Sequence, residues 1–225
     1  MVPIIKVTNE VLEGLNKLKI PYDIQNEKRN LDNFIYVPSL KIHVAKQRTH
    51  LGATWFDAHK ELQKEGLCMP TIPEFVEFLK YLKSLNNKEF QEIYNDITQV
   101  RSPWRAEWLD ADFKMKDKDL YINFNHVLDS NGNLVPKNSS ILDKETLMKD
   151  KLPGISLDNY LESSHTKQGL PNKKVKSGSL YYQYPRSDNN SVARFDALSG
   201  RAPLSCGRDP SNWASGLGVR AVRHE

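Results

Sequence analysis

Residues Ser191 to Arg223 read SVARFDALSGRAPLSCGRDPSNWASGLGVRAVR, and this segment decides how the rest of the chain is interpreted. Side chains of a β-strand point to its two faces in turn, so a period of two divides the segment into two sets. One set is small and mostly apolar, which suits burial; it comprises Phe195, Ala197, Ser199, Ala202, Leu204 and Cys206. A short apolar strand around Leu217 and Val219 closes the segment. We expect Phe195, Leu204 and Val219 to be nearly inaccessible to solvent.

The second set of side chains points the other way and has no common chemistry. It mixes an acid, bases, an aliphatic side chain, a proline and glycines, and proline and glycine favour edge or irregular backbone over a central strand. We therefore predict an exposed surface on which substitutions change stability little. The residues assigned to this surface are Asp196, Leu198, Gly200, Arg201, Pro203, Ser205, Gly207, Arg208, Asp209, Ser211, Asn212, Trp213 and Ala214.

The composition is typical of a soluble globular protein: 39% of the 225 residues are hydrophobic and 27% are charged. The net charge of +4 is mild, and Lys and Arg are interspersed with Asp and Glu, which disfavours a nucleic-acid partner. No apolar run reaches membrane-spanning length, and the opening MVPIIKVTNE lacks a signal-peptide pattern, so no membrane insertion is expected. A virion, a cell surface and the cytoplasm all stay open as locations. Cys68 and Cys206 are either free thiols or one bridge.

The first half of the chain carries clear helix signals. Thr54 is a predicted N-cap, and Thr71 with Glu74 forms a predicted capping box. The expected elements are helices at 7–18, 54–66, 71–85 and 88–99 and strands at 34–37 and 40–44. Trp55 and Phe78 lie on the apolar faces of two of these helices and are expected in the core.

The second half changes to strand-like patterns. Residues 106–115 and 120–124 form a predicted hairpin, and residues 129–133 form a turn before the next short strand. Residues from about 136 to 176 are polar, and we interpret them as an insertion with one or two short helices. Residues 179–185 then lead into the C-terminal segment. Strands at both ends of the chain favour a single α+β domain.

The residues Thr54 to Leu79, TWFDAHKELQKEGLCMPTIPEFVEFL, resemble the helix, turn and helix of C-type lectin folds in the formylglycine-generating-enzyme subgroup. That subgroup has a Trp-x-x-Ala helix, a Leu-Pro-Thr-like turn and a Glu-aromatic helix, and here Met69-Pro70-Thr71 takes the turn. The end of the chain, Gly216-Leu217-Gly218-Val219-Arg220, is similar to the final strand of the subgroup.

More narrowly, the arrangement resembles the variable proteins of diversity-generating retroelements, especially archaeal and archaeal-virus ones. The resemblance covers most of the chain except the insertion. It implies one C-type-lectin-like α+β domain over residues 1–225, in which helices pack on a small, irregular, mainly antiparallel sheet. It also implies a hypervariable region at about 191–223 that binds a protein or glycan ligand, for example on a cell surface. On this resemblance, the outward residues named above are the predicted ligand-binding residues, and Trp213, Arg201 and Arg208 are the expected anchors of binding.

The resemblance implies a mechanism of diversification that leaves a trace in composition. Template adenines are miscopied in such systems, and AAC or AAT codons changed at their first two positions never encode Lys, Glu, Gln, Met or Trp. Residues 187–222 contain no Lys, Glu, Gln or Met, although Lys and Glu are abundant before them. Trp213 breaks this rule and requires another adenine-containing codon. The β-propensity of a strand-rich segment is a second explanation for the missing residue types.

Other motifs are weaker, and we predict no catalytic residue, no metal site and no cofactor. The histidines are His43, His50, His59, His126, His165 and His224, and they show no metal-ligand spacing. Catalysis in the formylglycine-generating relatives depends on a cysteine pair, but only Cys206 lies in the C-terminal part. Ser211-Asn212-Trp213 does not reproduce the calcium-binding triplets of lectins.

An enzyme of the formylglycine-generating type and a fixed carbohydrate-binding module remain the alternative functions. Tyr181, Tyr182, Tyr184 and Trp213 are the candidate binding aromatics, or else packing residues.

Overall fold

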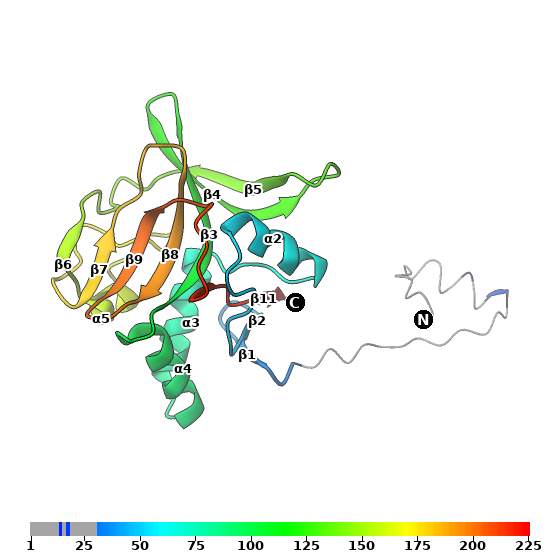
Figure 1. Ribbon diagram of the computed structural model, residues 1–225, viewed down its shortest axis with the longest axis horizontal. Helices are drawn as coiled ribbons and strands as arrows, with labels where there is room; N and C mark the ends of the chain where they lie inside the picture. Colours follow the sequence, from blue (N-terminus) through cyan, green and yellow to red (C-terminus); the bar gives the residue numbers. More distant parts are fainter. Residues whose placement is uncertain (1–13, 15–16, 19–30) are drawn as a thin grey trace. The chain divides into compact units, whose positions relative to one another are not determined.

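The computed structural model describes Gly14, Lys17, Leu18 and residues 31–225 (Figure 1). Most of the helix expected at 7–18 therefore lies outside the described residues. Residues 31–225 form one unit, which contains the complete C-terminal segment and all of the elements described below.

A large mixed sheet carries most of the fold. Its eight strands among the described residues are β3 (Arg105–Lys116), β4 (Asp119–Leu128), β5 (Leu134–Ile141), β6 (Lys151–Ile155), β7 (Leu180–Gln183), β8 (Ser191–Ala197), β9 (Ala202–Arg208) and β10 (Leu217–Gly218). Their order is β5-β4-β3-β8-β9-β7-β6, with β10 paired to β3, and the middle of this order can be followed in Figure 1. The β7–β9 and β10–β3 pairs are parallel and the other pairs are antiparallel.

A second sheet joins the last strand to the first two strands of the described unit. It consists of β1 (Phe34–Val37), β2 (Ile42–Ala45) and β11 (Val222–His224), all antiparallel, in the order β1-β2-β11. The strands expected at 34–37 and 40–44 are confirmed. The predicted hairpin is confirmed as β3 and β4, which pair directly.

The described residues form four helices: α2 (Trp55–Lys64), α3 (Ile72–Ser84), α4 (Lys88–Thr98) and α5 (Leu157–Glu162). The first two begin at the predicted caps, Thr54 and Thr71. The Thr54 side chain accepts a hydrogen bond from the Asp57 backbone N–H, as predicted for an N-cap. Both halves of the Thr71–Glu74 capping box are present. These contacts satisfy backbone donors that the first helical turn leaves without intrahelical partners.

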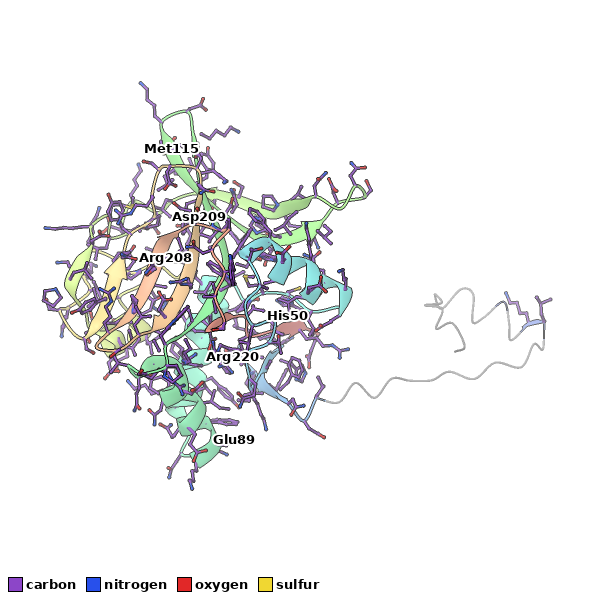
Figure 2. The ribbon with its side chains drawn as sticks, in the orientation of Figure 1. His50, Glu89, Met115, Arg208, Asp209 and Arg220 are labelled. Carbon is purple, nitrogen blue, oxygen red and sulfur yellow. The ribbon has the colours of Figure 1, made fainter. Side chains whose placement is uncertain are left out.

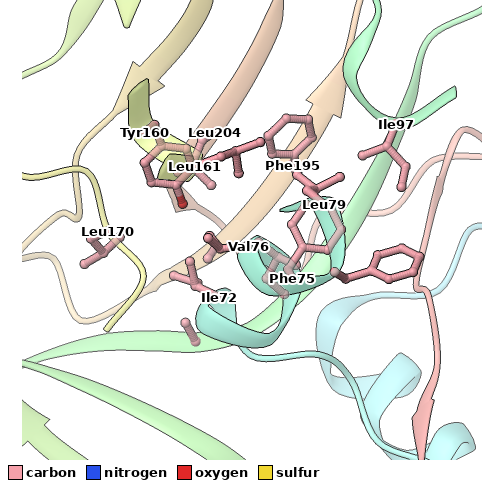
Figure 3. Packing of buried hydrophobic residues seen from close by; sticks show 14 of the residues in the cluster. Ile72, Phe75, Val76, Leu79, Ile97, Tyr160, Leu161, Leu170, Phe195 and Leu204 are labelled. Carbon is pink, nitrogen blue, oxygen red and sulfur yellow. The ribbon is translucent and has the colours of Figure 1, made fainter. Parts of the chain in front are cut away.

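The main apolar core lies between α3 and the large sheet. Figure 3 shows Phe75, Val76 and Leu79 of α3 directed toward Phe195 of β8 and Leu204 of β9. The rings of Phe75 and Phe195 have centroids 5.4 Å apart. Phe195 and Leu204 are 2% and 1% exposed, which confirms the predicted inward register. The burial of Trp55, Phe78 and Val219 is confirmed as well.

The predicted fold class is wrong, because the described residues are mostly β-structure with few helices. We expected an α+β C-type-lectin-like fold with helices on a small, irregular sheet, whereas the sheet has eight strands and dominates the structure. Two of these strands lie largely within residues 136–176, the expected insertion: β5 runs through Pro136, and β6 lies directly before α5, a short helix of the kind expected there. Both are outer strands; the side chains of β5 and of the first part of β6 are largely exposed, so they lack the apolar alternation that identifies a half-buried strand. Proline is tolerated at such edges.

Candidate functional site

The turn between β8 and β9 carries one of the two accessible parts of the predicted ligand-binding surface; the other is the loop after β9. Leu198 and Arg201 exchange backbone hydrogen bonds, and Gly200 between them adopts a φ of +83°. That left-handed conformation costs glycine little because it has no Cβ. The turn therefore projects Ser199, Gly200 and Arg201 into solvent at the end of two buried strands.

Beside this turn lies an open depression of about 630 Å³, which we call the arginine–aromatic groove. It is lined by Arg101, Ser102, Pro103, Trp104, Tyr181, Arg194, Leu198, Ser199, Gly200 and Arg201. The groove thus combines the predicted surface with residues before β3 and with β7, which pairs with β9 and places Tyr181 opposite Pro203.

Two guanidinium groups of the groove lie close to aromatic rings, of which Trp104 and Tyr181 line the groove and Trp108 is buried behind it. The Arg194 guanidinium carbon lies 6.0 Å from the ring centroid of Trp104 and 5.6 Å from that of Trp108. The Arg201 guanidinium carbon lies 5.9 Å from the Tyr181 ring centroid. Cations at such distances are attracted to the negative ring faces, which holds the long arginine side chains in place. The groove is consequently both cationic and aromatic.

A buried carboxylate lies on the same side of β8 as Arg194. Asp196 Oδ1 is 2.6 Å from Arg194 Nε, and Asp196 Oδ2 is 3.6 Å from Arg208 Nη2. The Ser205 hydroxyl donates to Asp196 Oδ2 at 3.4 Å and accepts from Arg208 Nη2 at 3.2 Å. Burial raises the pKa of Asp196, while the two arginines favour its charged form. This network neutralises the carboxylate and orients the arginines.

The predicted ligand-binding residues fall into three groups. Exposed are Gly200, Arg201, Ser211, Asn212 and Trp213, and half-buried are Leu198, Gly207, Arg208, Asp209 and Ala214. Figure 2 labels Arg208 and Asp209 at the end of β9, where the chain leaves the sheet. Buried, against prediction, are Asp196, Pro203 and Ser205. The predicted exposure of these three residues is wrong: β8 and β9 lie in the middle of the sheet, with other strands on both sides, and the side chains of Arg194 and Arg208 contact Asp196 and Ser205.

The candidate aromatics also separate. Tyr181 lines the groove, whereas Tyr182 is completely buried in the core. Tyr184 packs under the Arg186 guanidinium at 4.2 Å, outside the groove. Trp213 is 75% exposed on the loop after β9, so its ring is available to a ligand.

A second polar cluster joins residues that are distant in sequence: His59 of α2, Asp110 of β3 and His126 of β4. His59 Nε2 lies 3.5 Å from Asp110 Oδ1, and His126 Nδ1 lies 2.5 Å from the same oxygen. All three residues are at most 5% exposed. Burial lowers the pKa of His59 to about 4. Burial also opposes the charged form of His126, but hydrogen bonds and charges of Asp110 and Asp112 raise its pKa to about 9.

Sequence spacing did not reveal this cluster, because each residue comes from a different element. Two local signals pointed to it: His59 adjoins the apolar stripe of α2, and Asp110 interrupts an otherwise apolar stretch of β3. A polar side chain at a buried position requires a partner, but the sequence does not identify that partner.

A third cluster joins the two sheets through Glu107, which is fully buried. Its carboxylate contacts Arg105 Nη1 at 2.7 Å and Arg220 Nη2 at 2.9 Å. Arg220 also donates to the backbone oxygen of Ala45 in β2 at 2.9 Å. Burial opposes the charged form of Glu107, but the arginines outweigh this and lower its pKa to about 2. Arg220 belongs to the predicted final strand, and its role here is structural.

The cysteines are both free, and Cys206 is completely buried. Burial raises the pKa of the Cys206 thiol well above its usual range, which suppresses the reactive thiolate. Within the described part of the chain, no helix combines the length and apolar character needed to cross a membrane. Comparison with protein-family models, with curated protein sequences and with solved structures finds no match.

Proposed function

We propose that this chain is a non-enzymatic binding protein that presents interchangeable side chains from its C-terminal segment, as variable proteins of diversity-generating retroelements do. The observation that carries the proposal is the arginine–aromatic groove, half of whose lining comes from residues 194–201 of that segment. Binding pockets combine apolar and aromatic walls with a few polar groups, and this groove has both. Its ligand is a protein or a glycan.

The contrast between the two parts of the segment supports this proposal. Phe195, Leu204 and Cys206 are buried in the core, where they hold the backbone in place. The turn at 198–201 and the loop at 209–214 carry the accessible side chains. Display on this fold is therefore confined to the turn and the loop, and the centres of β8 and β9 serve as framework.

The chemistry of the groove indicates which ligand groups it favours. Exposed Arg201 offers a planar donor group that matches carboxylates, and Trp104 and Tyr181 offer flat apolar faces. Arg194 is buried and paired with Asp196, so it contributes positive charge to the groove wall. Exposed Trp213 adds a large aromatic surface on the same segment. Aromatic and arginine side chains dominate binding energy in many protein interfaces, so these residues are the expected anchors.

A pair of libraries tests the proposal. In the first, the exposed residues Arg201, Ser211, Asn212 and Trp213 are randomised together, and Gly200 is kept because its φ of +83° favours glycine. In the control library, the buried residues Asp196, Pro203 and Ser205 are randomised. We expect most members of the first library, and few of the second, to be soluble and to melt cooperatively. Loss of folding in most members of the first library would mean that these side chains carry structure, and the display proposal would be wrong.

The retroelement part of the proposal has its own test in the neighbouring DNA. We expect a near-identical repeat of the codons for residues 191–223 beside a reverse-transcriptase gene, with adenines at the codons that differ. Absence of both features would contradict diversification by a retroelement. The two libraries would then be the remaining test of the display proposal.

A further inference from the structure

We infer that His59, Asp110 and His126 form a binding site for a divalent transition-metal ion, with Zn²⁺ as the best match. One potential ligand atom from each side chain lies within 4.8 Å of the other two, and the three residues are all buried. This inference is independent of the ligand-binding proposal, because the cluster lies among α2, β3 and β4 and contributes nothing to the lining of the groove.

The distances suit a compact coordination sphere. Ligand atoms about 2.0–2.2 Å from a tetrahedral ion lie roughly 3.3 Å apart. The 3.5 Å between His59 Nε2 and Asp110 Oδ1 already matches this separation. The 2.5 Å between His126 Nδ1 and Asp110 Oδ1 is that of a hydrogen bond. An ion replaces the proton between these two atoms and moves them apart by less than about 1 Å.

His59 supplies the second, independent sign of a ligand. The residue is 1% exposed, and its Nε2 atom has no hydrogen-bond partner among the described residues. Leaving a buried polar atom unpaired costs free energy, so such atoms call for an explanation. A metal ion held by Asp110 and His126 accepts the lone pair of this nitrogen and removes the cost.

Asp112 completes a pattern that is common around metal-bound histidines. Its Oδ1 lies 3.5 Å from His126 Nε2, on the opposite side of the ring from Nδ1. A histidine that binds a metal through one nitrogen usually donates its other N–H to a carboxylate, which fixes the ring orientation. His126 is therefore placed between a ligand carboxylate and an orienting carboxylate.

The ligand set selects the class of metal. Two imidazoles and one carboxylate suit Zn²⁺ and neighbouring transition metals, whereas Ca²⁺ and Mg²⁺ prefer oxygen ligands throughout. A divalent ion also balances the two carboxylates, Asp110 and Asp112, once both histidines are neutral. Trp55 packs edge-on against both imidazoles, with ring centroids 4.3 Å from His59 and 4.9 Å from His126. Trp55 shields the site from water, and a change in its fluorescence can detect metal binding.

The test uses the full chain after dialysis against a chelator. Zn²⁺ is titrated by calorimetry, and Co²⁺ is titrated by visible absorption, since tetrahedral Co²⁺ has strong bands. We expect one equivalent of either ion to bind, Trp55 fluorescence to change, and the melting temperature to rise with Zn²⁺. H59Q and H126Q should weaken binding at least about tenfold, because each removes one of three protein ligands. H165Q, which changes a histidine outside the cluster, should leave binding unchanged.

Absence of stoichiometric Zn²⁺ and Co²⁺ binding to the wild-type chain at micromolar concentrations would overturn the inference, as would binding that H59Q leaves intact. If the ligand variants fail to fold, D112N provides the second variant. Loss of the orienting carboxylate should lower affinity about 10–100-fold. X-ray absorption of the wild-type zinc complex should then show two imidazole ligands, and a spectrum without imidazole scattering would also overturn the inference.

Discussion

Phe195 and Trp213 belong to the same C-terminal segment and differ sharply in exposure: Phe195 is 2% exposed and Trp213 is 75% exposed. Phe195→Ala should lower the free energy of unfolding by about 3–5 kcal/mol, since it removes a buried ring and leaves a cavity. Trp213→Ala should change the free energy of unfolding by no more than about 0.5 kcal/mol. Denaturant unfolding of both variants measures the contrast. Equal costs would contradict the division into framework and display.

Asp196 was predicted to lie on the exposed surface, but the structure buries it among charged and polar side chains. Its carboxylate contacts Arg194 and Arg208, so Asp196→Ala leaves two guanidinium groups without their partner. We expect a loss of about 1–3 kcal/mol in the free energy of unfolding, the cost of unpaired buried polar groups. Asn212→Ala, at an exposed position of the same segment, is the matched control. If the free energy of unfolding falls no more for Asp196→Ala than for Asn212→Ala, the network does not stabilise the fold.

Among the elements, α3 depends most visibly on its first turn. Thr71 accepts from the Glu74 backbone N–H, and Glu74 Oε2 accepts from the Thr71 backbone N–H at 2.8 Å. Thr71→Ala breaks this capping box and should cost about 1 kcal/mol, within a usual range of about 0.5–2 kcal/mol. Thermal or denaturant unfolding measures this loss of stability. Ser139→Ala, at an exposed position of β5, is the control. Because α3 covers Phe195 and Leu204, the cap also supports the framework of the display segment.

At the scale of the whole molecule, the Glu107 cluster links the two sheets, since Arg220 contacts both Glu107 of β3 and the backbone of β2. Glu107→Gln removes the charge that compensates two buried arginines and should cost about 3–5 kcal/mol at neutral pH. Unfolding of the wild-type and variant proteins at neutral pH measures this cost. Arg223→Gln, a half-buried arginine of β11, is the control.

The same cluster makes stability depend on pH. The folded protein lowers the pKa of Glu107 from 4.5 to about 2, so the unfolded chain binds the proton more readily. This contribution to stability is fully present above pH about 4.5 and is lost as the pH falls toward 2. Unfolding experiments between pH 7 and pH 2 should show a steeper acid loss for the wild type than for Glu107→Gln. Parallel profiles would contradict the role of the Glu107 charge.

Local structure was readable from the amino-acid sequence because it depends on neighbours a few residues away. The caps at Thr54 and Thr71 act within one helical turn, and the β3–β4 hairpin follows from the turn residues between two strands. The buried register of Phe195 and Leu204 follows from the alternation of small apolar side chains. The caps and the hairpin are stabilised by contacts that are short in sequence. The register of Phe195 and Leu204 was readable because alternation shows which side chains share a face, although the residues that bury them lie in α3.

The size of the sheet, the burial of Asp196 and the His59–Asp110–His126 cluster depend on pairings between distant residues. Alternation shows which side chains of β8 share a face, but it carries no information on whether β3 and β9 flank that strand or what covers its second face. The exposed edge strands β5 and β6 lack the apolar pattern that would reveal them. His59, Asp110 and His126 meet because α2 packs on β3 and β4, and that packing is set by the burial of the whole apolar core.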